Sequence, residues 1–278
     1  MQRACDILIL AASLKAAGEA FALATVVRAT AATAAKAGAK AVIRPDGSIL
    51  GGWIGGGCAR GAVVKAAKQA LADGKARYVS VQPPDLLDQQ GVRPGEEREG
   101  VRFVRNMCPS RGSMDFFIEA VLPRPDLVIC GSSPVAAALA DFAPRLGFAV
   151  TACAPADEQS AFAEVDRRIE SYVLPKEEPH ERFIVVSTQG RGDEEALRAA
   201  LAVDADYVAF VGSRLKAKSL KAELEQEGVD PARIAKIRAP AGLNIGAVEP
   251  EETALSILAE IVAFRRRGET GSEGDSRE

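Results

Sequence analysis

The pattern of apolar and polar positions changes near residue 123 and divides the chain into two parts. In the first part, short apolar runs between turn residues predict strands, and apolar residues at three- and four-residue spacing predict helices. Strands are expected at 21–27, 41–43, 48–50, 78–81, 101–105 and 116–121, and helices at 4–18 and from about residue 58 onward. The segments 30–40 and 84–100 are expected to be loops. The first part therefore mixes antiparallel hairpins and helices.

After Pro123-Arg124-Pro125, a stiff sequence suited to a linker, predicted strands and helices alternate. Strands are expected at 126–130, 149–153, 183–187 and 207–211, and helices at 134–146, 193–201, 215–226 and 251–265. Such alternation predicts a parallel sheet with helices on both faces. The predicted fold class is α/β: an N-terminal α+β domain at 1–122, then a C-terminal Rossmann-like doubly wound parallel sheet at 123–267. The Gly-, Ser- and acid-rich tail at 268–278 is expected to be disordered.

Composition excludes several classes of function. With 278 residues, 47% of them apolar and 26% charged, the chain can form two ordinary globular domains. Aromatic residues make up only 5% and the net charge is −3, so nucleic acid is not an expected partner. No apolar run predicts a membrane span, and the N-terminus does not resemble a signal peptide. The five widely spaced cysteines are then expected to be reduced thiols in the cytoplasm.

The chain contains a single histidine, His180, which lies in a polar stretch between Pro179 and Glu181. One imidazole in an expected loop argues strongly against a histidine-based metal site and against a Ser-His-Asp triad. Candidate chemistry therefore has to come from glycine-rich turns, thiols and cationic side chains.

Gly55-Gly56-Gly57-Cys58 has the clearest chemical meaning. The stretch follows the predicted hairpin and precedes a helical pattern, so Cys58 is expected at or near a helix N-terminus. Exposed N–H groups and the helix dipole at such a position favour anions and lower the pKa of a thiol. Three glycines let the backbone approach a ligand with no Cβ in the way. The motif predicts a ligand with a phosphate and a soft or redox-active centre; the alternative is a glycine-rich turn with a buried, inert cysteine.

A second candidate thiol, Cys108, lies in the turn Cys108-Pro109-Ser110-Arg111-Gly112-Ser113 between two predicted strands. Arg111 beside the thiol would stabilise a thiolate and pair with a phosphate. Cys58 and Cys108 are expected to face one cleft between the domains. Both are expected to react with alkylating agents faster than Cys130 and Cys153, which are placed in core strands.

The loop Gly131-Ser132-Ser133-Pro134-Val135-Ala136 stands where a dinucleotide-binding fingerprint would be, after the first strand of the second part. Only the first of the three fingerprint glycines is present. Ser133 adds a Cβ where a pyrophosphate would rest, although its hydroxyl could donate to that phosphate. The next strand does not end in an acid for the ribose, and Asp157 lies slightly beyond it. Two alternatives stay open: a tightly bound dinucleotide, or a nucleotide fold that has lost its usual ligand.

Two more loops are expected at carboxyl ends of strands, where doubly wound sheets bind ligands. One contains Gln189, and the other is Gly212-Ser213-Arg214 followed by Lys216 and Lys218. Cationic side chains near helix N-termini suit a phosphate, and a solvated helix face is the alternative for the two lysines. The full set of candidate cofactor-binding residues is Gly55, Gly56, Gly57, Cys58, Cys108, Arg111, Gly131, Ser132, Ser133, Gln189, Gly212, Ser213 and Arg214.

These motifs together resemble the XdhC/CoxI family. The resemblance is carried by Leu23-Ala24-Thr25-Val26-Val27-Arg28, Gly38-Ala39-Lys40, Asp46-Gly47, Gly56-Gly57-Cys58, Gly61-Ala62-Val63, Tyr207-Val208, Val211-Gly212-Ser213-Arg214 and most of the stretch from Ala239 to Ile261. It covers nearly all of residues 1–265, and the chain looks like the divergent, CoxF-like branch that accompanies carbon monoxide dehydrogenase. It departs from the family pattern where Pro109-Ser110 follows Cys108 in place of two glycines, and where Gly131-Ser132-Ser133 replaces a fuller Gly-x-Gly loop.

The resemblance implies a cytoplasmic, homodimeric maturation chaperone rather than an enzyme. Such proteins bind the molybdenum cofactor, as molybdopterin or its cytosine dinucleotide form, and assist its sulfuration. They deliver it to an apo molybdenum hydroxylase such as carbon monoxide or xanthine dehydrogenase, with a sulfur donor as a further partner. Cys58 and Cys108 would then be soft contacts for molybdenum, copper or sulfur. Two alternatives stay open: an FAD- or NAD(P)-dependent oxidoreductase that uses the Rossmann domain, and a regulatory scaffold that docks onto the dehydrogenase.

Overall fold

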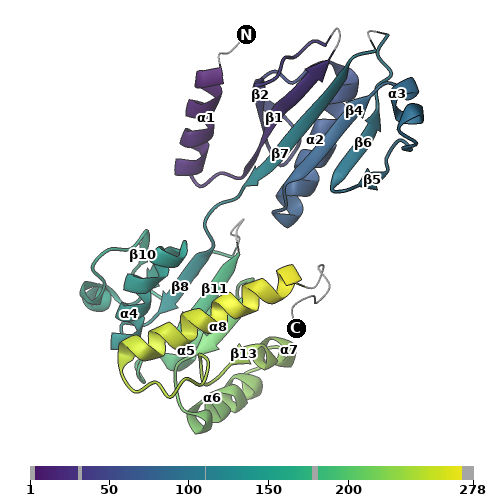
Figure 1. Ribbon diagram of the computed structural model, residues 1–278. Coiled ribbons are helices and arrows are strands. Elements are labelled where there is room, and N and C mark those ends of the chain that lie inside the picture. The colour runs from purple at the N-terminus through teal and green to yellow at the C-terminus, as the bar shows by residue number, and fades with distance from the viewer. Residues whose placement is uncertain (1–3, 31–32, 110, 177–180, 271–278) are drawn as a thin grey trace. The chain divides into compact units, whose positions relative to one another are not determined.

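The computed structural model describes residues 4–30, 33–109, 111–176 and 181–270 and divides the chain into two compact units, Met1–Pro123 and Arg124–Glu278 (Figure 1). Ser110 and His180 lie outside the described residues. Each unit has its own sheet and its own hydrophobic core. Within the described ranges, no helix is both long and apolar enough to cross a membrane.

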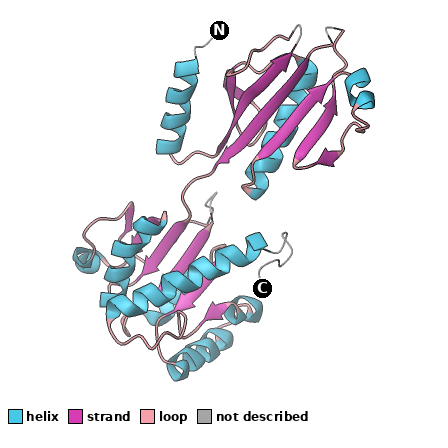
Figure 2. Ribbon diagram, viewed as in Figure 1, coloured by secondary structure: helices cyan, strands magenta, loops and turns pink. Residues whose placement is uncertain are grey.

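The N-terminal unit is a mixed sheet packed against helices (Figure 2). Its elements are α1 (Ala4–Ala16), β1 (Phe21–Thr30), β2 (Lys40–Ile43), β3 (Ile49–Gly52), α2 (Gly57–Asp73), β4 (Arg77–Gln82), α3 (Pro84–Gln89), β5 (Glu97–Arg98), β6 (Val101–Arg105) and β7 (Ser113–Val121). The strand order is β3-β2-β1-β7-β4-β6-β5, and neighbours are antiparallel except for the parallel pair β4–β6. The predicted hairpin and the mixture of hairpins and helices are confirmed.

The two faces of this sheet are covered differently, because successive side chains of a strand point to opposite faces. On one face, Phe116 packs with Val63 of α2. On the other face, Phe21 and Val42 pack with Ile7 of α1. The described part of α1 contacts mainly β2 and β3, so the portion of this second face over β4 and β6 keeps an open pocket.

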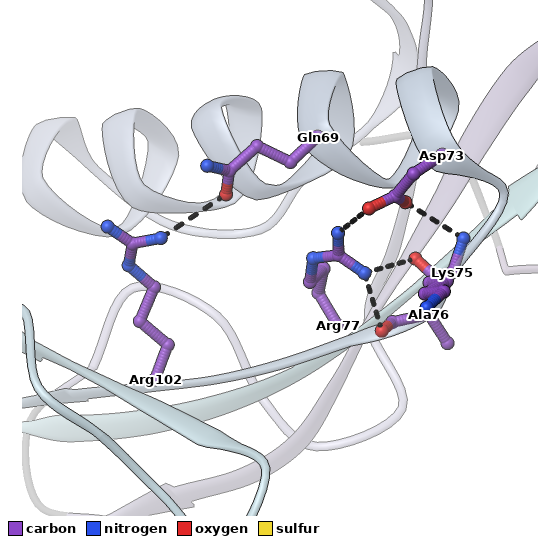
Figure 3. A network of polar contacts seen from close by, with 6 residues as sticks. All are labelled: Gln69, Asp73, Lys75, Ala76, Arg77 and Arg102. Carbon is purple, nitrogen blue, oxygen red and sulfur yellow. Dashed lines mark hydrogen bonds and ion pairs between the residues drawn. The ribbon is translucent and has the colours of Figure 1, made fainter. Parts of the chain in front are cut away.

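The C-terminal end of α2 is tied to the sheet by polar contacts (Figure 3). Asp73 accepts from the Lys75 backbone N–H at 3.0 Å and pairs with the Arg77 guanidinium. Arg102 of β6 donates to Gln69 Oε1 at 3.3 Å. Because a helix is a stiff rod, fixing this end also fixes where its N-terminal turn lies, and that turn carries the candidate thiol.

The C-terminal unit is a six-stranded sheet whose described strand pairs are all parallel. Its elements are β8 (Asp126–Cys130), α4 (Pro134–Phe142), the 3-10 helix η1 (Ala143–Leu146), β9 (Ala149–Cys153), the 3-10 helix η2 (Ala156–Ala161), β10 (Arg167–Ile169), β11 (Arg182–Val186), α5 (Asp193–Leu201), β12 (Tyr207–Phe210), α6 (Arg214–Gln226), α7 (Pro231–Ala235), β13 (Ile237–Arg238) and α8 (Pro250–Thr270). The strand order is β10-β9-β8-β11-β12-β13, which is the 3-2-1-4-5-6 order of Rossmann domains.

Helices cover both faces of this sheet (Figure 1). α4 and α8 form one core with alternate residues of the strands, in which Leu139 and Ile257 pack with Phe183. α5 and α6 form the other core, in which Leu197 and Leu224 are buried. The predicted fold class, a mixed N-terminal domain followed by a doubly wound parallel sheet, is confirmed.

The prediction of a continuous loop at 84–100 is wrong in two places. Pro84 stands at the first helical position of α3, where a missing N–H costs nothing, and Leu87 is 1% exposed. Glu97–Arg98 forms the edge strand β5 beside β6. Both elements are too short and too polar for a periodic pattern to show.

The prediction of strict alternation after residue 123 also needs correction. The connection from β9 to β10 contains the 3-10 helix η2 in place of an α-helix, and the short elements β10, α7 and β13 carry no pattern. The helix expected at 134–146 ends as an α-helix at Phe142, because Pro144 cannot donate the next backbone hydrogen bond. Conversely, α8 runs to Thr270, so 268–270 is helical where a disordered tail was expected, and 271–278 lies outside the described residues.

The stretch from Ala239 to Gly246, which carries part of the family resemblance, is held in place by Glu260. Its carboxylate accepts from the Gly242 N–H at 2.8 Å and the Tyr207 hydroxyl at 2.7 Å, and it pairs with Arg238 at 3.2 Å. Burial, with the hydrogen bond to Glu260, raises the pKa of Tyr207. The physical role of these residues is therefore to shape the Rossmann unit.

Candidate functional site

A pocket in the N-terminal unit brings Cys58 and Cys108 together, although they lie far apart in the sequence. Its volume is about 110 Å³. It is lined by Thr33, Ala34, Gly56, Gly57, Cys58, Ala59, Val81, Asn106, Cys108 and Met114. Cys58 is half-buried and Cys108 is exposed, so both sulfurs are accessible to a ligand. We refer to this site as the thiol pocket.

The N-terminus of α2 forms one wall of the thiol pocket. Gly56 is the N-cap residue and has no side chain that could accept a hydrogen bond from the first turn. The first turn contains no acidic side chain either. The N–H groups of this turn therefore keep their donor capacity, and the helix dipole adds positive charge there. An oxyanion such as a phosphate is the group that this arrangement binds best.

The three glycines of the motif have different roles. Gly55 has φ of +110°, a conformation that favours glycine, and a Cβ there would lie 2.9 Å from the end of the Met114 side chain. Gly56 and Gly57 have no such constraint, and a Cβ on either would meet nothing within 4 Å. Gly55 is thus needed for the turn, whereas the other two leave open space beside Cys58.

Asn106 holds the loop that carries Cys108, and it was not among the residues expected from the sequence. It is 9% exposed. Its Oδ1 accepts from the Cys108 N–H at 2.9 Å, and its Nδ2 donates to the Gly112 carbonyl at 2.6 Å. The signal that could have revealed it is an asparagine two residues before the thiol, since asparagine commonly bonds the backbone two residues on in a turn.

Arg111 does not take the place that was expected for it. Its side chain is 72% exposed, its guanidinium lies 3.9 Å from Asp85, and it is not among the residues that line the thiol pocket. The backbone explains this: Arg111 has φ of +50° and closes the turn through a hydrogen bond to the Cys108 carbonyl at 3.1 Å. The cationic partner expected beside Cys108 is therefore absent from the described lining.

Cys130 and Cys153 are core residues, as expected. They are neighbours on β8 and β9, and both are 0% exposed. The hydrogen bond with Cys153, together with burial, raises the pKa of the Cys130 thiol. Neither of them is poised to react with a ligand from solvent.

The described residues contain no group of three or more His, Cys, Asp or Glu side chains that could hold a metal ion. A protein site for a structural metal takes about four such ligands. Cys58 and Cys108 supply two such ligands to the pocket, and both are soft sulfur donors.

The Gly131 loop of the Rossmann unit is tightly closed. Gly131 has φ of +106°, and a Cβ there would lie 2.4 Å from the Ser187 carbonyl oxygen. The Ser133 hydroxyl accepts from the Ala136 N–H at 3.1 Å as the N-cap of α4, and it lies 2.6 Å from the Ser187 hydroxyl. Ser133 is 5% exposed. Its hydroxyl is thus buried and already bonded within the protein.

An acid does approach this loop, but it is Glu158 and not Asp157. Ser132 donates its hydroxyl hydrogen bond to the Glu158 carboxylate, and Arg191 lies 3.9 Å from the same side chain. A carboxylate bonded to this loop would repel a diphosphate placed there. The geometry therefore weakens the case for a tightly bound dinucleotide.

The loop of Gln189 is organised by Asp193. Thr188 and the Gly190 N–H donate to one carboxylate oxygen of Asp193, and Lys216 pairs with the other. Desolvation alone would raise the pKa of Asp193, but the hydrogen bonds from Lys216, Thr188 and Gly190 outweigh it and lower the pKa. Gln189 itself is exposed, with φ of +50°. Lys216 is thus already paired with a carboxylate.

The third candidate loop is explained largely by packing. A Cβ at Gly212 would lie 2.4 Å from the Phe210 ring. Ser213 is the N-cap of α6 and accepts from the Lys216 N–H at 3.2 Å. Arg214 is exposed at the start of that helix. Gly212 and Ser213 therefore have roles in the fold, whereas the exposed Arg214 remains a candidate ligand contact of this loop.

Glu158→Gln is expected to strengthen the binding of FAD or NAD(P). Removing one charge beside the loop is worth about 1 kcal/mol, or about fivefold in Kd. Calorimetry on the wild type and the variant measures the change. Asp157→Asn, which neutralises the exposed neighbouring acid, is the matched control and should have little effect. Equal affinities for all three proteins would show that Glu158 does not control access to the loop.

Two protein-family models match the chain. The XdhC Rossmann domain matches residues 127–261, and the XdhC and CoxI family matches residues 14–82. The uncharacterized protein YqeB of Escherichia coli (strain K12) is 31% identical over 242 residues, which are 84% of this chain and 41% of the relative. A probable xanthine dehydrogenase subunit of Bacillus subtilis (strain 168) is 30% identical over 161 residues, which are 55% of this chain and 47% of the relative. The chain thus spans less than half the length of these curated relatives.

A solved structure described as a xanthine dehydrogenase from Bacillus halodurans shares the fold. It matches with a TM-score of 0.58 at 20% identity, over 94% of this chain and 67% of the other. The fold therefore defines a class of proteins in which a mixed-sheet domain precedes a Rossmann-type domain. The two family models match separate parts of the chain, one in each unit. This chain belongs to the XdhC/CoxI family.

Proposed function

We propose that this protein is a maturation chaperone that holds the molybdenum cofactor of a molybdenum hydroxylase in the thiol pocket. The observation that carries the proposal is the meeting of Cys58 and Cys108 at an uncapped helix N-terminus. When bound, the cofactor would supply a soft metal–sulfur centre and a phosphate. The two thiols suit the first, and the N–H groups of the first turn of α2 suit the second.

The shape of the pocket supports this assignment for one end of the cofactor. Gly56 and Gly57 leave space that a Cβ would fill, directly beside Cys58. The volume of about 110 Å³ is below the roughly 300–1,000 Å³ of pockets that enclose a whole organic ligand. We therefore propose that the metal–sulfur end or a phosphate enters the pocket while the rest of the cofactor extends outside it.

The client enzyme in this proposal is a xanthine or carbon monoxide dehydrogenase. Similarity to a probable xanthine dehydrogenase subunit supports the first, and the resemblance of the sequence to the CoxF-like branch supports the second. A sulfur donor as partner, a homodimer and a cytoplasmic location are parts of the same proposal. The alternative, an FAD- or NAD(P)-dependent oxidoreductase, has less support because Gly131 is closed against Ser187 and Glu158 is bonded to Ser132.

Cys58→Ser tests the proposal by replacing a soft sulfur with a hard oxygen of similar size. Changes to groups that merely support metal ligands cost about 10–100-fold in affinity. We therefore expect at least about tenfold less molybdenum and pterin in the purified variant, and a matching loss of active dehydrogenase in cells without the wild-type protein. Metal analysis and the fluorescence of the oxidised pterin measure the first; enzyme assays measure the second.

Gly57→Ala separates the pocket from the fold. An added Cβ should fill space next to Cys58, and alanine in the first turn should maintain or raise helix stability by about 0.5–1 kcal/mol. Gly61→Ala is the matched control, because Gly61 lies one turn later on the same helix, also has open space and does not line the pocket. Loss of cofactor in the first variant alone supports the proposal; full cofactor content in both glycine variants and in Cys58→Ser contradicts it.

A further inference from the structure

The lining of the thiol pocket limits the chemistry that the pocket can support. Among the described residues that line it, none is charged and none is a histidine. Its side chains other than the two thiols are polar at Thr33 and Asn106 and apolar at Ala34, Ala59, Val81 and Met114. General acid–base chemistry needs a group that exchanges a proton near neutral pH, and here only the cysteines do so. The groups that can react in this pocket are therefore the two sulfurs.

The two thiols differ in exposure. Cys108 is exposed, whereas Cys58 is half-buried. Asn106 fixes the backbone at Cys108 by accepting from its N–H at 2.9 Å. A reagent that arrives from solvent therefore meets Cys108 before Cys58. This difference gives the pair a direction, from the outer thiol to the inner one.

The surroundings of Cys58 suit a small anion. The first hydrogen bond within α2 runs from the Arg60 N–H to the Gly56 carbonyl at 2.9 Å. The N–H groups of Gly57, Cys58 and Ala59 precede it and have no acceptor within the helix. Together with the helix dipole they stabilise negative charge beside Cys58. A Cβ on Gly56 or Gly57 would meet nothing within 4 Å, so there is also room next to the sulfur.

The size of the pocket selects a ligand of very few atoms. Its volume is about 110 Å³. One water-sized group needs about 10–15 Å³ of such space, whereas sites for whole organic ligands have roughly 300–1,000 Å³. The pocket therefore holds an added sulfur atom easily and does not admit a molecule as large as glutathione.

We infer that the thiol pocket is a sulfur relay, in which Cys108 accepts a sulfur atom from a persulfide donor and passes it to Cys58. The sulfur is then held as a persulfide anion at the start of α2. The donor is a protein or low-molecular-weight persulfide, R–S–SH. The relay requires the two thiols but does not require that a molybdenum cofactor binds in the pocket, so it goes beyond the proposed function.

Both steps are exchanges of one S–S bond for another. In the first, the Cys108 thiolate attacks the terminal sulfur of R–S–SH; the S–S bond of the donor breaks, and R–S⁻ leaves with its electron pair. In the second, the Cys58 thiolate attacks the terminal sulfur on Cys108, and the Cys108 Sγ leaves in the same way. The proton lost by each attacking thiol passes through water to the leaving thiolate. No oxidant or reductant is consumed.

Glutathione persulfide and the reduced full chain test the inference, because this donor is too large to enter the pocket. Timed samples are quenched with iodoacetamide, and mass spectrometry of the peptides shows which thiols carry an additional sulfur. We expect the sulfur on Cys108 first and then on Cys58. Cys130 and Cys153 should gain none, since both are 0% exposed.

Two variants separate the steps. Cys58→Ser should leave the sulfur on Cys108. With the donor at about 0.1 mM, Cys108→Ser should slow the loading of Cys58 by at least about tenfold, because a neighbouring thiol acts at an effective concentration in the millimolar range. Met107→Ala is the matched control: Met107 is 66% exposed beside Cys108, and its loss changes no thiol. Urea unfolding followed by Trp53 fluorescence checks that each variant is folded.

Several results would overturn the relay. Equal loading of Cys58 in the wild type and in Cys108→Ser would show that Cys58 takes sulfur directly. No additional sulfur on either thiol would show that the pocket does not accept it. A disulfide between Cys58 and Cys108 with release of sulfide would show attack on the wrong sulfur. Molybdenum and pterin content, measured on the same preparations, tests the proposed function separately.

Discussion

Iodoacetamide at neutral pH will alkylate Cys58 and Cys108 at least about a thousand times faster than Cys130 and Cys153. The first two thiols line a pocket and are accessible, whereas the second two are 0% exposed between sheet and helices. A fully buried thiol reacts only when the structure opens, and core openings cost several kcal/mol, so their population is about 10⁻³ or less. The raised pKa of Cys130 lowers its thiolate fraction further.

Mass spectrometry of timed labelling reactions gives each rate separately. Labelling in concentrated guanidinium chloride is the control, since unfolding should bring the four rates close together. Under the proposed function, bound cofactor should also slow Cys58 and Cys108 specifically. Comparable native rates for all four thiols would contradict the burial of Cys130 and Cys153. Protection of neither pocket thiol by cofactor would remove the case for a shared site.

Gly52→Ala is expected to destabilise the N-terminal unit severely, by about 4 kcal/mol or more. Gly52 has φ of +91°, and a Cβ there would lie 2.0 Å from the Lys40 carbonyl oxygen. That oxygen belongs to the neighbouring strand and also accepts from the Trp53 N–H at 3.0 Å. Since both atoms of the clash are held by backbone, the strands must separate or β3 must shift.

Gly38→Ala is the matched control for this prediction. Gly38 is in the same unit and has φ of +86°, but a Cβ there would meet nothing within 4 Å. Its cost should be only that of the left-handed backbone, about 1–2 kcal/mol. Urea unfolding followed by the fluorescence of Trp53, the only tryptophan of the chain, reports on this unit. A similar loss of stability in both variants would mean that backbone strain, not the close approach of β2 and β3, makes glycine necessary at position 52.

The structure also changes the meaning of the glycine-rich loops. From the sequence, the loops at Gly55 and Gly131 are both candidate ligand sites. A Cβ at Gly131 would clash with the Ser187 backbone, whereas a Cβ at Gly56 or Gly57 would enter open space. Glycine at position 131 serves close packing, and at positions 56 and 57 it is compatible with a ligand. The same residue type thus has different roles, and only the neighbouring atoms distinguish them.

Local pattern was sufficient for most of the fold. The main strands and helices follow from apolar spacing, and the place of Cys58 at the start of α2 follows from a glycine run before a helical pattern. The alternation of strands and helices in the second part led to the doubly wound sheet, which the strand order confirms. These predictions succeed because each depends on residues within a few positions of one another.

What depended on distant residues was decided only by the tertiary structure. Pairing of β4 with β6 and β7 brings Ser80 beside Asp115, and Gln82 is left with a buried acceptor that has no described partner. Asn106 positions Cys108, Arg111 turns toward Asp85, and Glu158 reaches Ser132. The short elements within 84–100 form because they pack against β6 and its surroundings. Strand pairing and side-chain packing join residues with no local signal for one another. The sequence alone therefore determined the main elements and the fold class, and the tertiary structure determined the short elements and which chemical groups meet.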